Sequence, residues 1–303
     1  MGVHDAPQWL VPAFVRACVG ADATASAEDI ERIGEALLAR WCEPGRHYHN
    51  ARHLADVLAR VDELAQEAHE ADLVRLAAWY HGAVFDAAER ASYAHRGGED
   101  ERASAALARL ELGELGLTPE AVNRVAELVG ALERHSPAND DADCAVLCDA
   151  DLAMLAAEPQ RYKAYLAEVR AEYAHLPVEE FVRARIAILH RLQQRPHLFA
   201  SPMGQNWEEP ARQNLDAELQ RLERELAAID AAQAGAQGAG QDDAGQGAGQ
   251  DDAVQAGAQG AGQDDAGQGA GQDDAVQAGA QSAGQDDAVQ SAGTTSADDQ
   301  QRA

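Results

Sequence analysis

The sequence predicts an all-α protein that ends in a disordered tail. Apolar residues recur at spacings of three and four along most of the first 230 residues, which is typical of helices packed on a core. No segment shows the strict alternation of apolar and polar residues that is typical of a half-buried strand. Near residue 230 the composition changes to Ala, Gly, Gln and Asp. We therefore expect one helical domain over residues 1–230 and a tail over residues 231–303.

The first half of the domain contains four predicted helices. They cover residues 9–19, 28–42, from 49 or 50 to 64, and 72–85. Each carries an apolar stripe, as Ile30, Ile33 and Leu37 do in the second helix. Pro44 and Gly45 separate the second helix from the third, because both residue types favour turns.

The second half contains six more predicted helices. They cover residues 99–112, 119–132, 144–155, 161–174, 178–194 and 208–229. Thr118 and Pro119 mark one helix start, because Thr is a good N-cap and Pro is well tolerated at the first helical position. A polar loop over residues 136–143 precedes the third of these helices.

Two acidic residues lie in the predicted helix that follows this loop. The spacing i, i+3, i+4 and i+7 places Cys144, Leu147, Cys148 and Asp151 on one face, whereas Asp149 points elsewhere. A lone carboxylate on a buried face is energetically costly unless it is paired or binds a metal. This spacing makes Asp151 a candidate metal ligand.

Three histidines lie in or beside the apolar stripes of other helices. His49 and His53 stand four residues apart, a spacing that puts them on one helical face. His81 follows Tyr80 at the edge of the next stripe. Two His and one carboxylate form a common ligand set for a divalent metal, and His53, His81 and Asp151 supply it. The alternative is that the His pair only caps a helix or faces solvent.

The charge of the chain narrows the range of partners. The formal net charge is −28; residues 231–303 contain 12 Asp and one Arg, so they contribute −11 and the body −17. Such an acidic body disfavours binding to nucleic acid polymers and to anionic membranes. A small phosphorylated molecule remains compatible, because a bound cation can supply local positive charge.

Cysteine usage and hydropathy favour a cytoplasmic protein. The four cysteines form no CxxC pair, no signal peptide is visible at the N-terminus, and no apolar run approaches 18 residues. We therefore expect free thiols and no membrane-spanning segment.

The tail consists of a degenerate repeat of 22 residues, with copies that open at Gln233, Gln255 and Gln277. Its few valines cannot bury enough apolar area to offset the entropy cost of ordering, so we predict disorder. A calcium-binding β-roll is the alternative, but the glycine-rich pattern of such rolls is missing.

Several segments together resemble a known superfamily. YHNARHLADV, beginning at Tyr48, resembles the YHNxxHxxDV signature of cyclic-nucleotide phosphodiesterases, which belong to the HD superfamily. The body more closely resembles bacterial predicted HD-superfamily metal-dependent phosphohydrolases. The similar stretches are RHYHNARH, AAWYHGAVFD, LCDADLAML, RYKAYLAEVRAEY and ARQNL, and they cover most of residues 8–225. The resemblance implies an HD-domain-type helical bundle.

The resemblance also implies roles for individual residues. His53 matches the first metal-binding His, His81 the His of the HD dyad, and Asp151 the last metal-binding Asp. His49 matches the His that protonates the leaving oxygen, a task that suits the pKa of imidazole. The implied cofactor is a divalent ion, which could be Mn, Fe, Mg, Zn or Ni. The implied function is hydrolysis of a phosphate ester of a nucleotide or small metabolite.

One position departs from the family pattern. Gly82 stands where the dyad has Asp, a residue that binds and often bridges metal ions in this superfamily. Asp86 lies four residues on, on the same predicted helical face, and could compensate. A one-metal site and a protein that binds no metal both remain open. The alternative function is therefore a catalytically degenerate HD-fold protein that senses a ligand or acts as a scaffold.

Four further residues are secondary candidates for supporting or substrate contacts. His135 lies near the place where some HD proteins have an extra His, although a His is also favoured at a helix C-terminus by the helix dipole. Glu101 matches a Glu in the resemblance, although Glu is ordinary in a first helical turn. Arg185 could grip a phosphate or pair with a carboxylate. Asp149 is the fourth candidate for a supporting or substrate contact.

Overall fold

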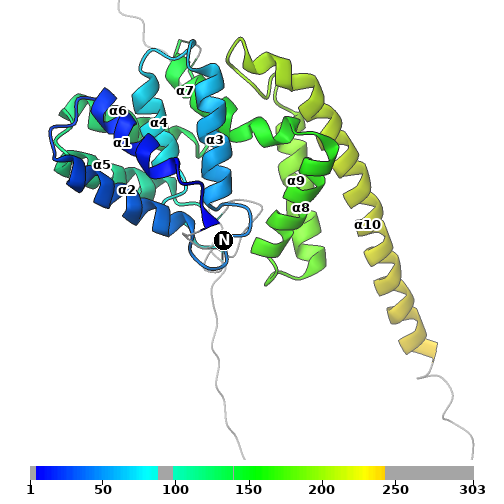
Figure 1. Ribbon diagram of the computed structural model, residues 1–303. Helices are drawn as coiled ribbons and strands as arrows, with labels where there is room; N and C mark the ends of the chain where they lie inside the picture. Colours follow the sequence, from blue (N-terminus) through cyan, green and yellow to red (C-terminus); the bar gives the residue numbers. More distant parts are fainter. Residues whose placement is uncertain (1–4, 88–97, 139, 243–303) are drawn as a thin grey trace, which may run out of the picture. The chain divides into compact units, whose positions relative to one another are not determined.

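The computed structural model describes residues 5–87, 98–138 and 140–242, and these residues are mostly helical (Figure 1). Within this part of the chain there is no β-strand, only an isolated antiparallel bridge between Phe85 and Glu99. The predicted all-α class is therefore confirmed. None of the described helices combines the length and apolar character needed to cross a bilayer.

Ten α-helices and two short 3-10 helices follow one another along the described residues. They are α1 (Leu10–Gly20), α2 (Ala27–Trp41), α3 (Ala51–Leu64), α4 (Ala71–Tyr80), α5 (Glu101–Glu114), α6 (Pro119–Ala131), α7 (Ala142–Leu152), η2 (Ala153–Ala156), α8 (Pro159–Glu172), α9 (Val178–Gln193), η3 (Gly204–Trp207) and α10 (Glu208–Asp242).

Side chains that cap the helices explain several of their starts. Ser26 accepts a hydrogen bond from the backbone N–H of Asp29, and Thr118 caps α6 in the same way. At α3, the side chain of Asn50 accepts a hydrogen bond from the backbone N–H of Arg52. Such caps satisfy N–H groups that have no partner within the helix, so they define where the chain can become helical.

Two hydrophobic clusters form the interior. The first joins α1 to α7 and includes the fully buried rings of Trp41 and Trp79. The second joins η2 and α8 to α10 with the 195–205 segment, and it includes Tyr165 and Phe199. Tyr48, from the segment before α3, belongs to the second cluster, and Trp207 packs against both. The segment before α3 therefore lies where the two clusters meet.

Two helix ends differ from the prediction. Helix α4 ends at Tyr80 rather than near residue 85, so Asp86 does not lie on its face as we expected. The last helix extends to Asp242, past the predicted domain boundary at residue 230. Ala and Gln favour helix when a preceding helix supplies the nucleus, which explains the extension. The predicted disorder of the tail otherwise concerns residues 243–303, which lie outside the described part.

A buried ion pair joins α9 to α10. Arg185 donates hydrogen bonds from Nε and Nη2 to the carboxylate of Glu218, at 2.8 and 3.1 Å, and from Nη2 to the Tyr165 hydroxyl at 3.1 Å. Tyr162 donates its hydroxyl proton to the same carboxylate at 2.6 Å. Arg185 was expected either to grip a phosphate or to pair with a carboxylate, and the structure shows the pair.

Removal of this carboxylate should destabilise the domain strongly. Glu218→Ala leaves a buried guanidinium without its carboxylate, which costs about 3–5 kcal/mol in comparable buried pairs. Urea unfolding followed by circular dichroism measures the change. The matched control, Glu223→Ala, removes an exposed carboxylate from the same helix and should change stability by no more than about 0.5 kcal/mol. Equal stabilities of the two variants would contradict the assignment.

Candidate metal centre

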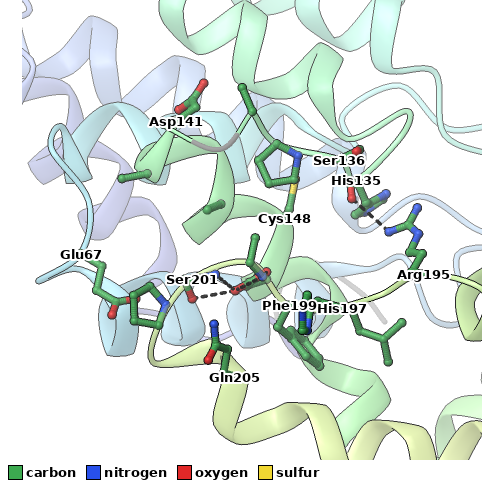
Figure 2. Close-up of a pocket in the computed structure, with 18 of the residues that line it drawn as sticks. Glu67, His135, Ser136, Asp141, Cys148, Arg195, His197, Phe199, Ser201 and Gln205 are labelled. Carbon is green, nitrogen blue, oxygen red and sulfur yellow. Dashed lines mark hydrogen bonds between the residues drawn. The ribbon is translucent and has the colours of Figure 1, made fainter.

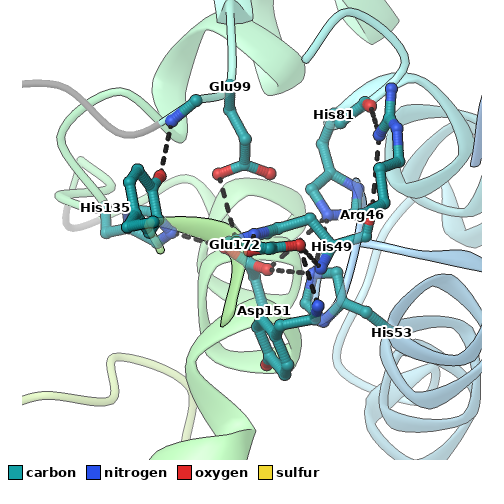
Figure 3. Close-up of polar contacts among 12 residues, drawn as sticks. Arg46, His49, His53, His81, Glu99, His135, Asp151 and Glu172 are labelled. Carbon is teal, nitrogen blue, oxygen red and sulfur yellow. Dashed lines mark hydrogen bonds and ion pairs between the residues drawn. The ribbon is translucent and has the colours of Figure 1, made fainter. Parts of the chain in front are cut away.

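Three side chains from α3, the end of α4 and α7 converge on one point (Figure 3). His53 Nε2 lies 3.2 Å from His81 Nε2 and 3.2 Å from Asp151 Oδ1. His81 Nε2 lies 3.6 Å from the same carboxylate oxygen. The predicted convergence of His53, His81 and Asp151 is therefore observed, and the three ligand atoms lie within 4.8 Å of one another.

This cluster fits a divalent cation on its own geometry. Metal–nitrogen and metal–oxygen bonds of about 2.0–2.2 Å place neighbouring ligand atoms about 3 Å apart, as these three are. Both His side chains are buried, and the Asp151 side chain is 12% exposed. Few water molecules can therefore solvate the lone pairs of these three ligand atoms. Two imidazoles and one carboxylate suit Mn, Fe, Zn or Ni more than Mg, which prefers oxygen ligands.

The backbone sets the tautomer of His81. His81 caps the C-terminus of α4, and its Nδ1 lies 2.6 Å from the carbonyl oxygen of Ala78. A carbonyl can only accept, so Nδ1 carries the proton and Nε2 turns a lone pair toward the cluster. Burial also lowers the pKa of His81, which favours the neutral form that binds metals.

His135 supports the cluster from the far side of Asp151. Its Nε2 lies 2.7 Å from Asp151 Oδ2, the oxygen that does not face His53 and His81. Burial opposes ionisation of Asp151, but hydrogen bonds from His135 and His53 outweigh it and hold the pKa of Asp151 well below its usual range. The sequence left open whether His135 belongs to the site or only suits a helix C-terminus, and in the structure its ring contacts this carboxylate.

The backbone of His135 adopts a left-handed conformation with φ of 45°, which is uncommon for a residue other than glycine. Arg195 stabilises this turn, because Nη1 donates to the carbonyl of His135 at 3.0 Å and Nη2 to that of Arg134 at 2.7 Å. Figure 2 shows Arg195 beside His135 at one end of a neighbouring pocket. The segment after α9 thereby holds the His135 ring in place.

His49 lies beside the cluster and is held by a carboxylate that sequence analysis missed. Because α3 begins at Ala51, His49 precedes the helix instead of sharing its face, yet its ring centroid lies 5.5 Å from that of His53. Its Nδ1 donates to Glu172 Oε2 at 2.7 Å, and its Nε2 lies 3.9 Å from Glu99 Oε2. Burial lowers the pKa of His49, but Glu172 and Glu99 outweigh it and raise the pKa to about 9.

Glu172 is fixed by more than His49. Its Oε1 accepts hydrogen bonds from the backbone N–H groups of Tyr48 and His49, at 2.8 and 2.7 Å. The sequence contained a signal for it, because Glu172 continues the buried stripe of Tyr162, Tyr165 and Val169 along α8. Like Asp151, Glu172 is a carboxylate on a buried helical face and so needs a partner.

Aromatic and cationic side chains occupy the surroundings of Gly82. A Cβ atom built on Gly82 would collide with the indole ring of Trp41, whose Nε1 donates to the carbonyl of Trp79 at 3.0 Å. The buried guanidinium of Arg46 donates to the carbonyl of Gly82 at 2.7 Å and stacks 4.9 Å from the ring centroid of Phe85. The Trp41 ring and the Arg46 guanidinium thus occupy the space beside Gly82.

The remaining candidates lie outside the three-residue cluster. Asp149 faces the 195–205 segment, where its carboxylate accepts hydrogen bonds from the backbone of Ala200 and from Ser201. Asp86 is exposed in the segment after α4, so the expected compensation for Gly82 lacks its helical basis. Glu101 opens α5 and lines the cavity described next, and burial raises its pKa.

A cavity of about 540 Å³ opens at the cluster. His49, His53, His135 and Asp151 all contribute to its lining. One wall is a face of α9 that carries Arg191 beside Ile188 and Leu192, and Arg195 follows just after the helix ends. The lining also includes Glu99, Glu101 and Glu133. The volume suits a small metabolite.

Comparison with known proteins adds no family assignment. No protein-family model matches the chain, and no curated protein sequence matches it. Functional inference therefore depends on the geometry of the site.

Purified protein should bind about one equivalent of a transition metal, as a single three-ligand cluster predicts. Asp151→Asn keeps the side-chain shape but weakens the ligand, so the bound metal measured by elemental analysis should be lost. His47→Ala, which removes an exposed imidazole near the site, should keep it. Wild-type protein that contains no metal and does not bind added Mn or Fe would contradict the assignment of these residues as metal ligands.

Restoration of an acidic residue at position 82 should not create a second metal site. In Gly82→Asp the new side chain meets Trp41, and overpacking of this kind costs about 1–3 kcal/mol. We expect a lower melting temperature and no more metal than in the wild type. Two metal equivalents in the variant, with unchanged stability, would show that the Trp41 ring does not occupy this space.

Proposed function

We propose that this protein is a mononuclear, metal-dependent phosphohydrolase of the HD-domain type that acts on a phosphate ester of a nucleotide or small metabolite. One observation carries the proposal: His53, His81 and Asp151 form a ligand cluster at a cavity that His49 also lines. The resemblance of YHNARHLADV to the phosphodiesterase signature supports the same reading.

His53, His81 and Asp151 would hold the metal. When bound, a divalent cation supplies Lewis acidity that activates water and polarises a phosphoryl oxygen. Ala78 keeps a lone pair of His81 directed at the site, and His135 keeps Asp151 ionised and oriented. Leu152, Leu155 and Ile188 add an apolar part to a lining that also carries charged side chains.

His49 is the proposed proton donor. With a pKa of about 9, its imidazole is protonated at neutral pH, and Glu172 engages Nδ1 so that Nε2 faces Glu99 and the cavity. As the bond between phosphorus and the ester oxygen breaks, the leaving oxygen takes the Nε2 proton of His49. The water oxygen forms the new bond to phosphorus, and a proton of that water returns to His49, so the products are an alcohol and inorganic phosphate.

A non-catalytic sensor or scaffold is the second candidate function. The observation that favours it is the packing of Trp41 and Arg46 around Gly82, where the HD dyad has a carboxylate. Such a protein would keep the cavity and bind a ligand without turnover.

A phosphate-release screen separates the two candidates. Full-length protein is incubated with nucleotides and sugar phosphates, each in the presence of Mn, Fe, Mg, Zn or Ni. We expect metal-dependent release of phosphate from at least one group of substrates, and its loss in Asp151→Asn. Metal-loaded protein that binds a nucleotide in calorimetry yet releases no phosphate would favour the sensor.

Replacement of the proton donor should reduce turnover without loss of metal. His49→Gln removes the acid, and general acid catalysis contributes about 10²- to 10⁴-fold in rate. We expect kcat to fall within that range while metal content stays at the wild-type level, because His49 is not a ligand. His190→Gln, which changes an exposed imidazole on α9, should leave kcat unchanged. Loss of metal in His49→Gln would instead indicate a ligand role.

A further inference from the structure

A second cavity lies among α8, α9 and α10, apart from the metal ligands. Its volume is about 590 Å³, within the range of small-molecule sites. None of His49, His53, His81 and Asp151 contributes to its lining. Arg185 lines both this cavity and the one at the metal centre.

The walls of this cavity are largely apolar. Leu166 and Val169 come from α8, Phe181 and Val182 from α9, and Leu222 from α10. At the start of α9 the Val178 side chain also lines it and is 50% exposed. The apolar wall therefore extends to the solvent-exposed start of α9.

The charge of the lining differs from that of the protein. Four cationic side chains line the cavity, with two carboxylates: Lys163, Arg170, Arg185 and Arg221, against Glu218 and Glu225. This is an excess of two positive charges in a chain whose net charge is −28. A cationic rim on an anionic surface concentrates small anions locally.

Two of these cations, Arg170 and Lys163, form no ion pair with a carboxylate among the described residues. Arg170 donates to the carbonyl oxygens of Tyr173 and Leu176, which position the guanidinium without neutralising it. Lys163 is exposed at the rim, within reach of a ligand that enters from solvent. Arg185 and Arg221, by contrast, are paired with Glu218 and Glu225, which also line the cavity.

We propose that this cavity binds a small amphipathic anion, with its apolar body between α8, α9 and α10 and its carboxylate near Lys163 and Arg170. The apolar walls disfavour a nucleotide, which would bury polar groups there. Residues 243–303 are the alternative occupant within the chain, but they are acidic and contain only three valines as large apolar residues, so they cannot fill these walls.

The single lysine of the chain provides a direct probe. Lys163 is the only lysine among the 303 residues, so reductive methylation with ¹³C-formaldehyde labels one side chain and keeps its charge. Titration of the full-length protein with decanoate should shift this NMR signal in a saturable manner, and decanol should shift it far less. No shift with decanoate, equal affinity for decanol, or a shift that follows protein concentration alone would overturn the proposal.

Matched variants locate the ligand. Arg221→Glu reverses a charge at the rim and should weaken decanoate binding about fivefold, the scale expected of exposed ion pairs. Arg224→Glu makes the same change on an exposed residue of α10 that does not line the cavity, and it should leave affinity unchanged. Ala217→Trp places a large ring at the lining and should abolish binding. Equal effects of the two arginine variants, or full binding in Ala217→Trp, would exclude this site.

Discussion

One carboxylate organises the centre of this molecule. Asp151 presents Oδ1 to His53 and His81 and Oδ2 to His135, so residues from α3, from the end of α4 and from the turn after α6 meet at a single negative charge. Without it, two buried imidazole nitrogens 3.2 Å apart would face each other with no anion between the helices that carry them. The packing of α3 against α4 and α7 therefore depends on the charge state of this group as well as on apolar burial.

Charged side chains flank the Asp151 cluster on two sides. On one side, His49 is paired with Glu172 and faces Glu99. On the other, Arg46 is buried against Trp41 and hydrogen-bonded to the carbonyl of Gly82. The HD pattern that the sequence resembles has an Asp at position 82, and a carboxylate there would offset a second ion. Here a guanidinium and an indole ring occupy that neighbourhood, which is why we propose mononuclear chemistry.

Local patterns were sufficient to predict the helices and part of the site. The stripe position of Asp151 and the histidines at the edges of other stripes identified a cluster that the fold brings together. The same periodicity places Glu172 on a buried face of α8, so its burial was also predictable from the sequence. The ends of α4 and α10 were less predictable, because packing and the extension of an existing helix set them rather than apolar spacing.

The sequence patterns did not predict which distant segments contact each other. The contact of Trp41 with position 82 joins residues 41 apart, and the hydrogen bond between His135 and Asp151 requires a left-handed turn at a residue other than glycine. The separation of Asp149 from Asp151 was correctly indicated by helical spacing, whereas the partner of Asp149 in the 195–205 segment was not.

Anomalous diffraction from crystals soaked in Mn²⁺ tests the one-cation site most directly. A single peak in contact with Nε2 of His53, Nε2 of His81 and Oδ1 of Asp151, with none beside Gly82, is the result that the structure predicts. A second peak beside Gly82, or no peak among the three ligands, would contradict the mononuclear centre.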